Sequence, residues 1–316
     1  LVAKVLIGVI QRRKRLGVFK KPKRFDANVV VVGGGSAGLV TSLIVAGAKA
    51  KVVLVEKHRM GGDCLYTGCV PSKSIIRSGR IMSYIRRAAD YGIVDAAGKV
   101  DFAAVMQRVQ GVIETIEPHD SPERFTSLGV DCMSGAARLI SPYEVEVGGK
   151  IITTESIVIA SGARPFVPPV PGLADIDYLT SDNVWSLTEL PPRLLVVGGG
   201  PIGCELAQAF SHLGSKVTQV DMAARIMPRE DEDVSAAVSA RFLEQGIDLL
   251  TGHKLLKFET VDGEHFMEAE HEGSTVRIAF DKVLLAIGRK ANTEDFGLEE
   301  IGVALTPQGT IGEEEG

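Results

Sequence analysis

A repeated segment constrains the fold of this chain more than any other feature. Residues 29–56 read VVVVGGGSAGLVTSLIVAGAKAKVVLVE, and residues 194–221 read LLVVGGGPIGCELAQAFSHLGSKVTQVD. The two segments align without a gap at an offset of 165 residues. Each combines an apolar strand, a glycine turn, a helix and a second strand ending in an acid, the opening βαβ unit of a dinucleotide-binding domain. The repeat therefore predicts an α/β fold with two Rossmann-like domains.

The glycines and the acid of each repeat have separate physical tasks. In a G-x-G-x-x-G turn, the first glycine permits the tight turn, the second admits a pyrophosphate, and the third lets helix and strand pack closely. The helix N-terminus then offers N–H groups to phosphate. Each acid follows the last glycine by 18 residues and is expected to bind ribose hydroxyls. The predicted residues are Gly33, Gly35, Gly38 and Glu56 in the first repeat, and Gly198, Gly200, Gly203 and Asp221 in the second.

The segments around the repeats indicate that one domain is inserted into the other. Helical patterns cover residues 68–90 and 101–117, and short strands (VEVG, KIITT and SIVIA) with turns between them are expected within residues 128–160. Strand-like alternation returns in residues 247–287. Two dinucleotide sites imply two dinucleotides, most simply FAD and NAD(P)H. We predict an FAD-binding domain from residues 26–164 and 285–316, with an NAD(P)-binding domain, residues 165–284, inserted into it.

Two cysteines lie in the stretch GGDCLYTGCVPSK, residues 61–73. Pro71 fits the first turn of a helix, and a periodic apolar run follows it: Ile75, Ile76, Ile81, Met82 and Ile85. Cys69 is therefore expected at or next to a helix N-terminus, where the dipole favours thiolate over thiol. Four residues separate Cys64 from Cys69, which is enough chain to bring them to disulfide distance. The spacing alone also fits two ordinary buried cysteines in a glycine-rich loop.

This stretch resembles the redox-disulfide signature of the class I pyridine nucleotide-disulfide oxidoreductases, which include dihydrolipoamide dehydrogenase, glutathione reductase and mercuric reductase. Residues 159–165, IASGARP, resemble the family's ATGARP crossover, with Ser161 in place of the usual Thr. Residues 286–292, AIGRKAN, resemble its AxGRxPN return into the flavin domain. The resemblance covers about residues 26–312, and the four motifs follow in the family's order.

The resemblance implies that electrons pass from NAD(P)H through FAD to the cysteine pair. Cys69 would lie nearest the flavin, Cys64 would exchange with substrate, and Lys73 would lie near flavin N5 and pair with Glu205. Glu205 alone also fits an acid favoured by a helix N-terminus. Further implied FAD contacts are Ser36 at the pyrophosphate, Ala37, Lys57, Gly62, Asp63, Lys73, Gly135, Ala136, Ser161, Gly162 and Arg289. Further implied NAD(P) contacts are Pro201, Ile202, Glu205, Ala286 and Gly288.

The same resemblance leads to a mercuric reductase-like function. GGDCLYTGCVPSK and residues 116–125, IEPHDSPERF, resemble bacterial mercuric reductases most. The expected substrate is a disulfide or a thiol-bound mercuric ion. The alternatives are a dihydrolipoamide dehydrogenase that runs toward NAD+, or a membrane-tethered redox-sensing flavoprotein without a small disulfide substrate. Because Asp221 repels a 2′-phosphate, NADH is the expected donor, with Arg225 as a partial offset.

The family pattern also implies more chain than is present here. Family members close the flavin domain after this point and add a dimerisation domain with a His–Glu acid/base pair, so the full protein is expected to be a homodimer. Residues 312–316, GEEEG, replace the expected strand. We therefore expect the sequence to be truncated at both ends, and we expect this chain alone to have incomplete FAD contacts and no general acid/base.

Charge separates the N-terminal arm from the remainder of the chain. Residues 11–24 carry eight basic side chains and no acid, whereas residues 25–316 have a formal charge of −14. An acidic body argues against a nucleic-acid substrate. Residues 1–10 are apolar apart from Lys4 and too few to span a bilayer. The order fits the end of a membrane segment with a cytoplasmic flank, hence a site at the cytoplasmic face of a membrane; an amphipathic helix or a linker on the acidic body fits equally.

The remaining cysteines and the histidines predict no metal site. The chain has four cysteines and six histidines, without a CxxC pair or a Cys/His cluster of zinc-like spacing. Cys132 and Cys204 have no counterpart role in the family. We interpret both as buried small hydrophobic residues.

Overall fold

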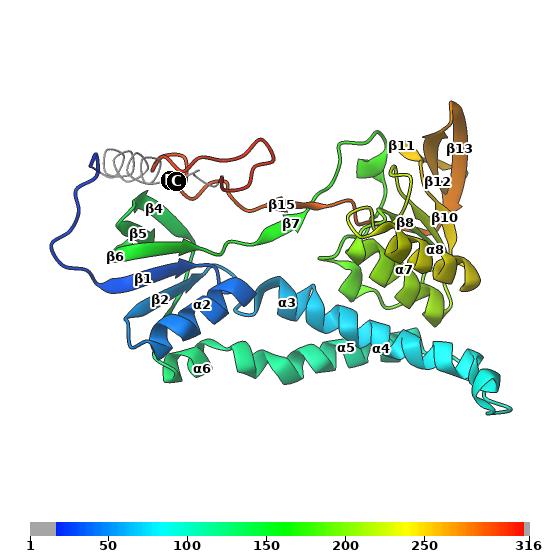
Figure 1. The fold of residues 1–316 in the computed structure, drawn as a ribbon, viewed down its shortest axis with the longest axis horizontal. Coiled ribbons are helices and arrows are strands. Elements are labelled where there is room, and N and C mark those ends of the chain that lie inside the picture. The colour runs from blue at the N-terminus through cyan, green and yellow to red at the C-terminus, as the bar shows by residue number, and fades with distance from the viewer. Residues whose placement is uncertain (1–16, 313–316) are drawn as a thin grey trace. The chain divides into compact units, whose positions relative to one another are not determined.

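The computed structural model describes residues 17–312, and contacts divide the chain into two compact units (Figure 1). Unit 1 comprises Leu1–Cys64, Ile116–Arg164 and Lys290–Gly316, and unit 2 comprises Leu65–Thr115 and Pro165–Arg289. The apolar start of the N-terminal arm, the first part of its basic stretch and the acidic residues 313–316 lie outside the described residues. Both units combine parallel strands with helices, so the predicted α/β class is confirmed.

Unit 1 is built on a six-stranded mixed sheet with the strand order β3-β2-β1-β6-β5-β4. Its main elements are β1 (Ala27–Val32), α2 (Ser36–Gly47), β2 (Val52–Glu56), α6 (Pro122–Ser127), β3 (Val130–Ser134), β4 (Ala137–Ser141), β5 (Glu144–Val147) and β6 (Lys150–Ile159). Strand β1 pairs in parallel with β2 and with the second half of β6, whereas β4, β5 and the first half of β6 are antiparallel. Apart from the half-buried Val29, the valines of β1 and β2 are almost wholly buried, as expected for parallel strands covered on both faces.

The strand boundaries in this unit correct one sequence-based expectation. The sequence predicts KIITT and SIVIA as separate short strands, but β6 runs through both segments and ends at Ile159. The first half of β6 pairs with β5 and the second half with β1, so a single long strand serves both parts of the sheet. The VEVG segment overlaps β5 as predicted.

Unit 2 contains a parallel sheet, β10-β9-β8-β14, and an antiparallel sheet, β11-β12-β13. Its main elements are α4 (Cys69–Arg86), α5 (Phe102–Ile116), β8 (Arg193–Val197), α7 (Pro201–Leu213), β9 (Lys216–Val220), α8 (Glu232–Glu244), β10 (Asp248–Leu250), β11 (Lys254–Val261), β12 (Glu264–His271), β13 (Ser274–Phe280) and β14 (Lys282–Leu285). One core joins the two sheets, with Leu195 and Val197 of the parallel sheet packed among Phe258, Met267 and Phe280. The predicted strands of residues 247–287 are thereby confirmed.

Helices α4 and α5 confirm the two predicted helical segments, and α4 packs closely on α7. A Cβ on Gly79 of α4 would lie 3.1 Å from the carbonyl oxygen of Ala209 in α7, so a small residue permits this approach. The buried face of α4 includes serines and Gly79, whereas Ile81 of the predicted apolar run is 48% exposed. Residues 65–115 therefore cluster with unit 2, although the sequence-based division assigned them to the flavin domain. The division by cofactor stays a prediction.

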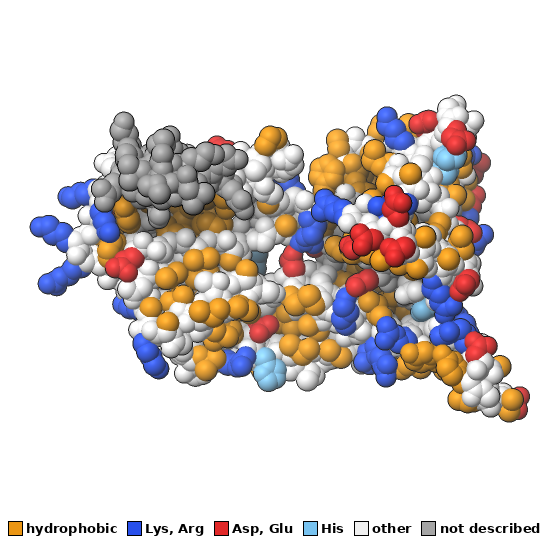
Figure 2. All heavy atoms as spheres, viewed as in Figure 1, with side chains coloured by type: hydrophobic (Ala, Val, Ile, Leu, Met, Phe, Trp, Pro, Cys, Tyr) orange, Lys and Arg blue, Asp and Glu red, His pale blue; other side chains and the backbone are white. Residues whose placement is uncertain are grey.

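Figure 2 shows apolar side chains gathered on the surface where Figure 1 places α2. Within this helix, Val40 and Ile44 are 57% and 67% exposed. Within residues 17–312, no helix has both the length and the apolar character that crossing a membrane requires.

Candidate functional site

The first glycine turn joins β1 to α2 in unit 1. Gly33 has a φ of +111°, and a Cβ there would lie 2.2 Å from the carbonyl oxygen of Ala160. A Cβ on Gly38 would lie 1.8 Å from the carbonyl oxygen of Gly33. Glu56 closes the turn from the end of β2, since its Oε2 accepts a 2.6 Å hydrogen bond from Gly34 N–H. Backbone thus surrounds the first and third glycines and excludes any side chain.

The second glycine turn, between β8 and α7 in unit 2, repeats this geometry. Gly198 has a φ of +117°, and its Cβ would lie 2.3 Å from the carbonyl oxygen of Ala286. A Cβ on Gly203 would lie 2.1 Å from the carbonyl oxygen of Gly198. Asp221 accepts hydrogen bonds from Gly199 N–H at one carboxylate oxygen and from Ala223 N–H at the other. The 165-residue offset is therefore a structural repeat as well as a sequence repeat.

The middle glycine of each turn lies open, and this is the feature that fits a dinucleotide. A Cβ on Gly200 would meet no atom within 4 Å, and one on Gly35 would meet only Gly62 Cα, at 3.8 Å. Each of these glycines is also the N-cap of its helix, without a side-chain cap. The N–H groups of the first helical turn are thus left for an anionic ligand. The residues present therefore fit a pyrophosphate at both turns.

Other predicted flavin contacts gather around the first turn. Ser36 and Ala37 are the first residues of α2. Gly135, with a φ of +144°, donates its N–H to the carbonyl oxygen of Glu56. Gly62, with a φ of +55°, approaches Gly35 so closely that a Cβ would lie 2.6 Å from its Cα. The structure thus places these residues along one edge of unit 1, while their contact with a flavin stays a prediction.

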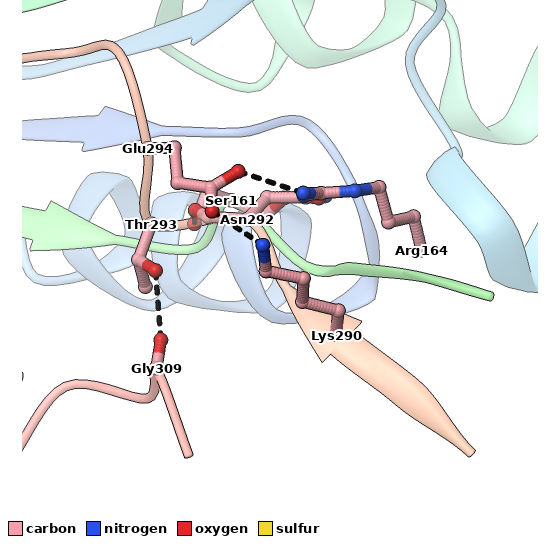
Figure 3. A network of polar contacts seen from close by, with 7 residues as sticks. All are labelled: Ser161, Arg164, Lys290, Asn292, Thr293, Glu294 and Gly309. Carbon is pink, nitrogen blue, oxygen red and sulfur yellow. Dashed lines mark hydrogen bonds and ion pairs between the residues drawn. The ribbon is translucent and has the colours of Figure 1, made fainter. Parts of the chain in front are cut away.

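Ser161 belongs to a network of polar contacts in unit 1 (Figure 3). We call Ser161, Arg164, Lys290, Asn292, Thr293, Glu294 and Gly309 the crossover network. Ser161 Oγ donates to the carbonyl oxygen of Asn292, and Asn292 Nδ2 donates back to the carbonyl oxygen of Ser161. Arg164 Nη2 lies 2.7 Å from Glu294 Oε2, and Lys290 Nζ pairs with Oε1 of the same carboxylate. These contacts join the two segments through which the chain leaves and re-enters unit 1. In the same two segments, β7 (Ala163–Pro165) and β15 (Arg289–Ala291) pair with each other as a two-stranded sheet.

The cysteines occupy two consecutive helices. Cys64 lies half-buried in the short helix α3 (Gly62–Tyr66), and Cys69 is the exposed first residue of α4. The N-cap of α4 is Gly68, and Pro71 lies in the first helical turn. The expectation that Cys69 lies at a helix N-terminus is therefore confirmed. A helix N-terminus is a position where aligned peptide dipoles favour a thiolate, and that role of Cys69 stays a prediction.

Lys73 and Glu205 form the pair that the family resemblance implied. Lys73 Nζ of α4 lies 2.8 and 2.7 Å from the two carboxylate oxygens of Glu205 in α7. Both side chains are substantially exposed, at 61% and 44%, so solvent screens the attraction and the pair adds little stability. Lys73 lies one turn beyond Cys69 on α4, and a role of the pair at the reaction site stays a prediction.

Sequence reasoning missed Trp185, the only tryptophan of the chain. Its Nε1 donates to the carbonyl oxygen of Thr67, between the two cysteines, and to that of Ser181. The Thr67 hydroxyl itself is buried without a hydrogen-bond partner among the described residues. A buried polar atom of this kind suits a bound polar group. The only signal in the sequence was that tryptophan occurs once. It could not have indicated the contact with Thr67, which lies 118 positions away.

The remaining predicted nucleotide contacts lie in unit 2. Pro201 and Ile202 begin α7, and Ile202 is 38% exposed. Ala286 borders Gly198, and Gly288 has a φ of +138°. Arg289, predicted as a flavin contact, donates from Nη1 to Ser181 Oγ at 3.3 Å.

The other two cysteines differ in their surroundings. Cys204 is 6% exposed, and burial raises the pKa of its thiol to about 11. Cys132 is only partly buried, and burial raises its thiol pKa as well. The interpretation of Cys204 as a buried residue is confirmed, whereas Cys132 is less enclosed than predicted.

Comparison with known proteins gives relatives along nearly the whole chain. The chain is 34% identical over 286 residues to the mercuric reductase of Staphylococcus aureus, covering 90% of this chain and 52% of that protein. It is 33% identical over 302 residues to the dihydrolipoyl dehydrogenase of Bacillus subtilis, covering 90% and 63%. The chain spans about half the length of the mercuric reductases that it matches.

A solved structure and a family assignment agree with these relatives. The HOCl-induced flavoprotein disulfide reductase RclA of Escherichia coli, solved as a Cu(II) complex, superimposes with a TM-score of 0.77 at 27% identity, covering 93% of this chain and 62% of that one. Residues 27–315 match the pyridine nucleotide-disulphide oxidoreductase family. The resemblance inferred from four motifs is therefore confirmed. This chain belongs to the pyridine nucleotide-disulphide oxidoreductase family.

Proposed function

We propose that this chain carries the nucleotide and disulfide chemistry of an FAD-dependent NAD(P)H:disulfide oxidoreductase of the mercuric reductase type. One observation carries the proposal. Cys69 begins the 18-residue helix α4, in a chain that also has two glycine turns open at their middle residue. A thiol at a helix N-terminus with a second cysteine five positions before it suits thiol–disulfide exchange.

The proposed reaction converts NAD(P)H, one proton and a disulfide into NAD(P)+ and two thiols. Bound flavin supplies the two-electron transfer between the nicotinamide and the Cys64–Cys69 disulfide. The Cys64 thiolate attacks a substrate disulfide, which releases the first thiol and forms a mixed disulfide. Cys69 then attacks the sulfur of Cys64, which releases the second thiol and restores the Cys64–Cys69 disulfide. The N-terminus of α4 stabilises the thiolate of Cys69 while the cysteine pair is reduced.

For the substrate we propose a mercuric ion held by two thiolates, because soft metal ions bind thiolate sulfur strongly. With this substrate, the reduced cysteine pair gives its two electrons to Hg(II) and returns to the Cys64–Cys69 disulfide, Hg(II) becomes Hg(0), and the two thiolates that held the ion leave as thiols. The balance is then NADH, one proton and the dithiolate complex of Hg(II) converted into NAD+, Hg(0) and two thiols. The dihydrolipoyl dehydrogenase relatives support the alternative of a dithiol oxidised with NAD+, and a sensor without a small substrate is the third reading. The test assays the flavin-loaded, full-length protein with NADH against Hg(II), Cu(II), lipoamide and glutathione disulfide. Hg(II)-dependent oxidation of NADH that Cys64→Ser abolishes is expected. Equal oxidation by wild type and Cys64→Ser contradicts the proposal.

We propose NADH as the preferred donor. Asp221 ends β9 with a carboxylate fixed by two backbone N–H groups, and a carboxylate there repels a 2′-phosphate. Arg225, the residue expected to offset this repulsion, donates instead to the backbone carbonyl oxygens of Pro228 and Glu230. These contacts favour a stronger NADH preference than the sequence alone implied.

We also propose that residues 1–24 hold the protein at the cytoplasmic face of a membrane. Eight cations within 14 residues contribute up to about 1 kcal/mol each near an anionic leaflet, falling off within a Debye length. In vesicle co-sedimentation, the chain from residue 1 should bind anionic vesicles at low salt and leave them at high salt, while a chain that starts at Phe25 should stay in solution. If both stay in solution at low salt, the tether is wrong.

For the assembly we propose a homodimer of the full-length protein, which the family resemblance implies. Light scattering on the flavin-loaded protein tests this proposal. A single monomer mass at every concentration contradicts it.

A further inference from the structure

Two polar side chains lie beneath the second glycine turn, in the core of unit 2. Gln219, the penultimate residue of β9, is 1% exposed, and Cys204 on α7 is 6% exposed. Gln219 Nε2 donates to the carbonyl oxygen of Gly198 at 2.9 Å. It also lies 3.6 Å from Cys204 Sγ, which in turn lies 3.4 Å from the carbonyl oxygen of Gly199. Both side chains therefore contact backbone carbonyl oxygens of the turn from within the core.

The first repeat shows what packing alone requires at these two positions. In the alignment of the two repeats, Leu54 corresponds to Gln219 and Leu39 corresponds to Cys204. Leu54 and Leu39 are 1% and 6% exposed, so each pair has the same burial. A buried amide is costly unless it is hydrogen-bonded, and Gln219 Oε1 has no partner among the described residues. Because leucines fill the same space in unit 1, packing does not explain the polar pair.

The hydrogen bond of Gln219 changes how one peptide group of the turn is held. In unit 2, the Gly198–Gly199 peptide is bound at both ends, by Gln219 at its carbonyl oxygen and by Asp221 at its N–H. In unit 1, Glu56 holds the N–H of Gly34 in the same way, but Leu54 has no donor to offer Gly33. The second turn is thus fixed by side chains at a point where the first is not.

We propose that Gln219, supported by Cys204, is a positioning residue that keeps the second turn in its nucleotide-binding shape while no dinucleotide is bound. The inference rests on the proposed function, in which the pyridine nucleotide enters and leaves in every cycle whereas the flavin stays. A site that binds its ligand anew in each cycle gains affinity when the protein is already ordered before the ligand arrives, because binding then loses less conformational entropy. A resident cofactor can hold its own turn in place.

Cys204 takes part in this arrangement as a thiol. Since burial raises its pKa to about 11, the side chain keeps its proton at neutral pH. The S–H group is then available as a weak donor to Gly199. This protonation also separates Cys204 from the redox pair, which requires thiolates.

The test compares Gln219→Met, which keeps the bulk but removes the donor, with the control Gln208→Met. Gln208 lies on α7 and bonds Gln245, away from the turn. In the flavin-loaded, full-length protein, we expect Gln219→Met to weaken NADH binding roughly five- to tenfold, the loss of one hydrogen bond. Flavin content and kcat at saturating NADH should stay unchanged, and hydrogen exchange at Gly199 should accelerate in the nucleotide-free protein. Gln208→Met should change neither NADH affinity nor Gly199 exchange.

A double variant guards against a misfolded single variant. Cys204→Leu with Gln219→Leu installs the residues that already pack in unit 1, and it should fold and lose the same affinity. Unchanged NADH affinity in either folded variant, or an equal loss in Gln208→Met, overturns the inference and leaves the proposed function intact. If the wild-type protein itself binds neither NADH nor NADPH, the proposed function fails and the inference fails with it.

Discussion

The two glycine turns have the same backbone geometry, but the buried side chains beneath them differ. In each turn, a Cβ on the first or third glycine of the motif would lie within 2.3 Å of a carbonyl oxygen. An acid at the end of the next strand accepts the N–H of the residue that directly follows the first glycine, Gly34 in unit 1 and Gly199 in unit 2. Beneath the turn, unit 1 has two leucines where unit 2 has a thiol and an amide. Under the proposed function, the dinucleotide constrains the backbone and the acid of each turn, whereas the side chains beneath the turn differ between a resident flavin and a nicotinamide nucleotide that is exchanged in each cycle.

The cysteines provide the prediction with the largest expected effect. Cys64→Ser and Cys69→Ser should each lower disulfide-dependent turnover roughly a thousandfold or more, because the two thiols act as a unit. NADH should still reduce the bound flavin in both variants, because that step uses the glycine turns and not the cysteines.

Absorption spectra then distinguish the two cysteines. Cys64→Ser retains the thiolate at the α4 N-terminus and should show a long-wavelength band with oxidised flavin, while Cys69→Ser should show none. Identical spectra for the two variants would contradict the assigned roles.

A second prediction is that the third glycine of a turn matters for stability of the fold, whereas the middle glycine matters for nucleotide binding. Gly203→Ala should destabilise the fold by about 3 kcal/mol or more, since its Cβ would lie 2.1 Å from the rigid backbone oxygen of Gly198. Gly200→Ala should cost at most about 1 kcal/mol, because nothing lies within 4 Å, yet it should weaken NADH binding. Denaturant unfolding and NADH titration measure the two effects.

The same pair of substitutions in unit 1 extends the comparison. Gly38→Ala should destabilise the fold and Gly35→Ala should lower flavin content, with NADH affinity unchanged in any protein that retains flavin. Loss of NADH binding in Gly35→Ala, or of flavin in Gly200→Ala, would reverse the assignment of the two turns.

A third prediction concerns the acids. Asp221→Asn should weaken NADH binding roughly ten- to a hundredfold, because a charged hydrogen-bond acceptor is lost. It should affect NADPH less, so the ratio of the two kcat/KM values should fall toward one. Glu56→Gln is the matched control in unit 1 and should leave that ratio unchanged. A wild-type kcat/KM that is higher for NADPH than for NADH would refute the role given to Asp221.

How much of the site is predictable from sequence depends on how local each constraint is. The turns are predictable because Gly33 and Gly38 belong to a short motif with fixed spacing, and the acids because the repeat fixes their distance from it. The Lys73–Glu205 pair joins residues 132 positions apart, and it was predictable only from the family resemblance. Neither the contact of Trp185 with Thr67 nor the clustering of residues 65–115 with unit 2 has a local signal, since both depend on tertiary packing.

Gln219 is an intermediate case. Its alignment with Leu54 places an amide where the first repeat has an apolar residue in a buried strand, and that mismatch is visible in the sequence. Its meaning required the structure, because only there does the amide meet the carbonyl oxygen of Gly198. For the same reason, the sequence alone predicts no more than a small hydrophobic residue at Cys204.

The last and smallest prediction compares an arginine–carboxylate contact in each unit. In unit 1, Lys290 and then Arg164 lower the pKa of Glu294. In unit 2, Arg193 lowers the pKa of Asp281, to which it bonds through its backbone N–H as well as its side chain. A carboxyl with a lowered folded-state pKa stabilises the protein above its unfolded-state pKa, and that contribution disappears as the pH falls through the folded-state value.

Glu294→Gln and Asp281→Asn should therefore lower stability at neutral pH and match wild type below the folded-state pKa values, under the ordinary 4.5 and 3.8. The effect should be larger for Asp281→Asn, because Glu294 is exposed and solvent screens its two ion pairs. Thermal melting followed from pH 7 to pH 3 measures both differences, and Asp295→Asn, which removes the carboxylate next to the crossover network, is the control. A difference from wild type that persists unchanged at pH 3 would show that the substitutions act through packing and not through charge.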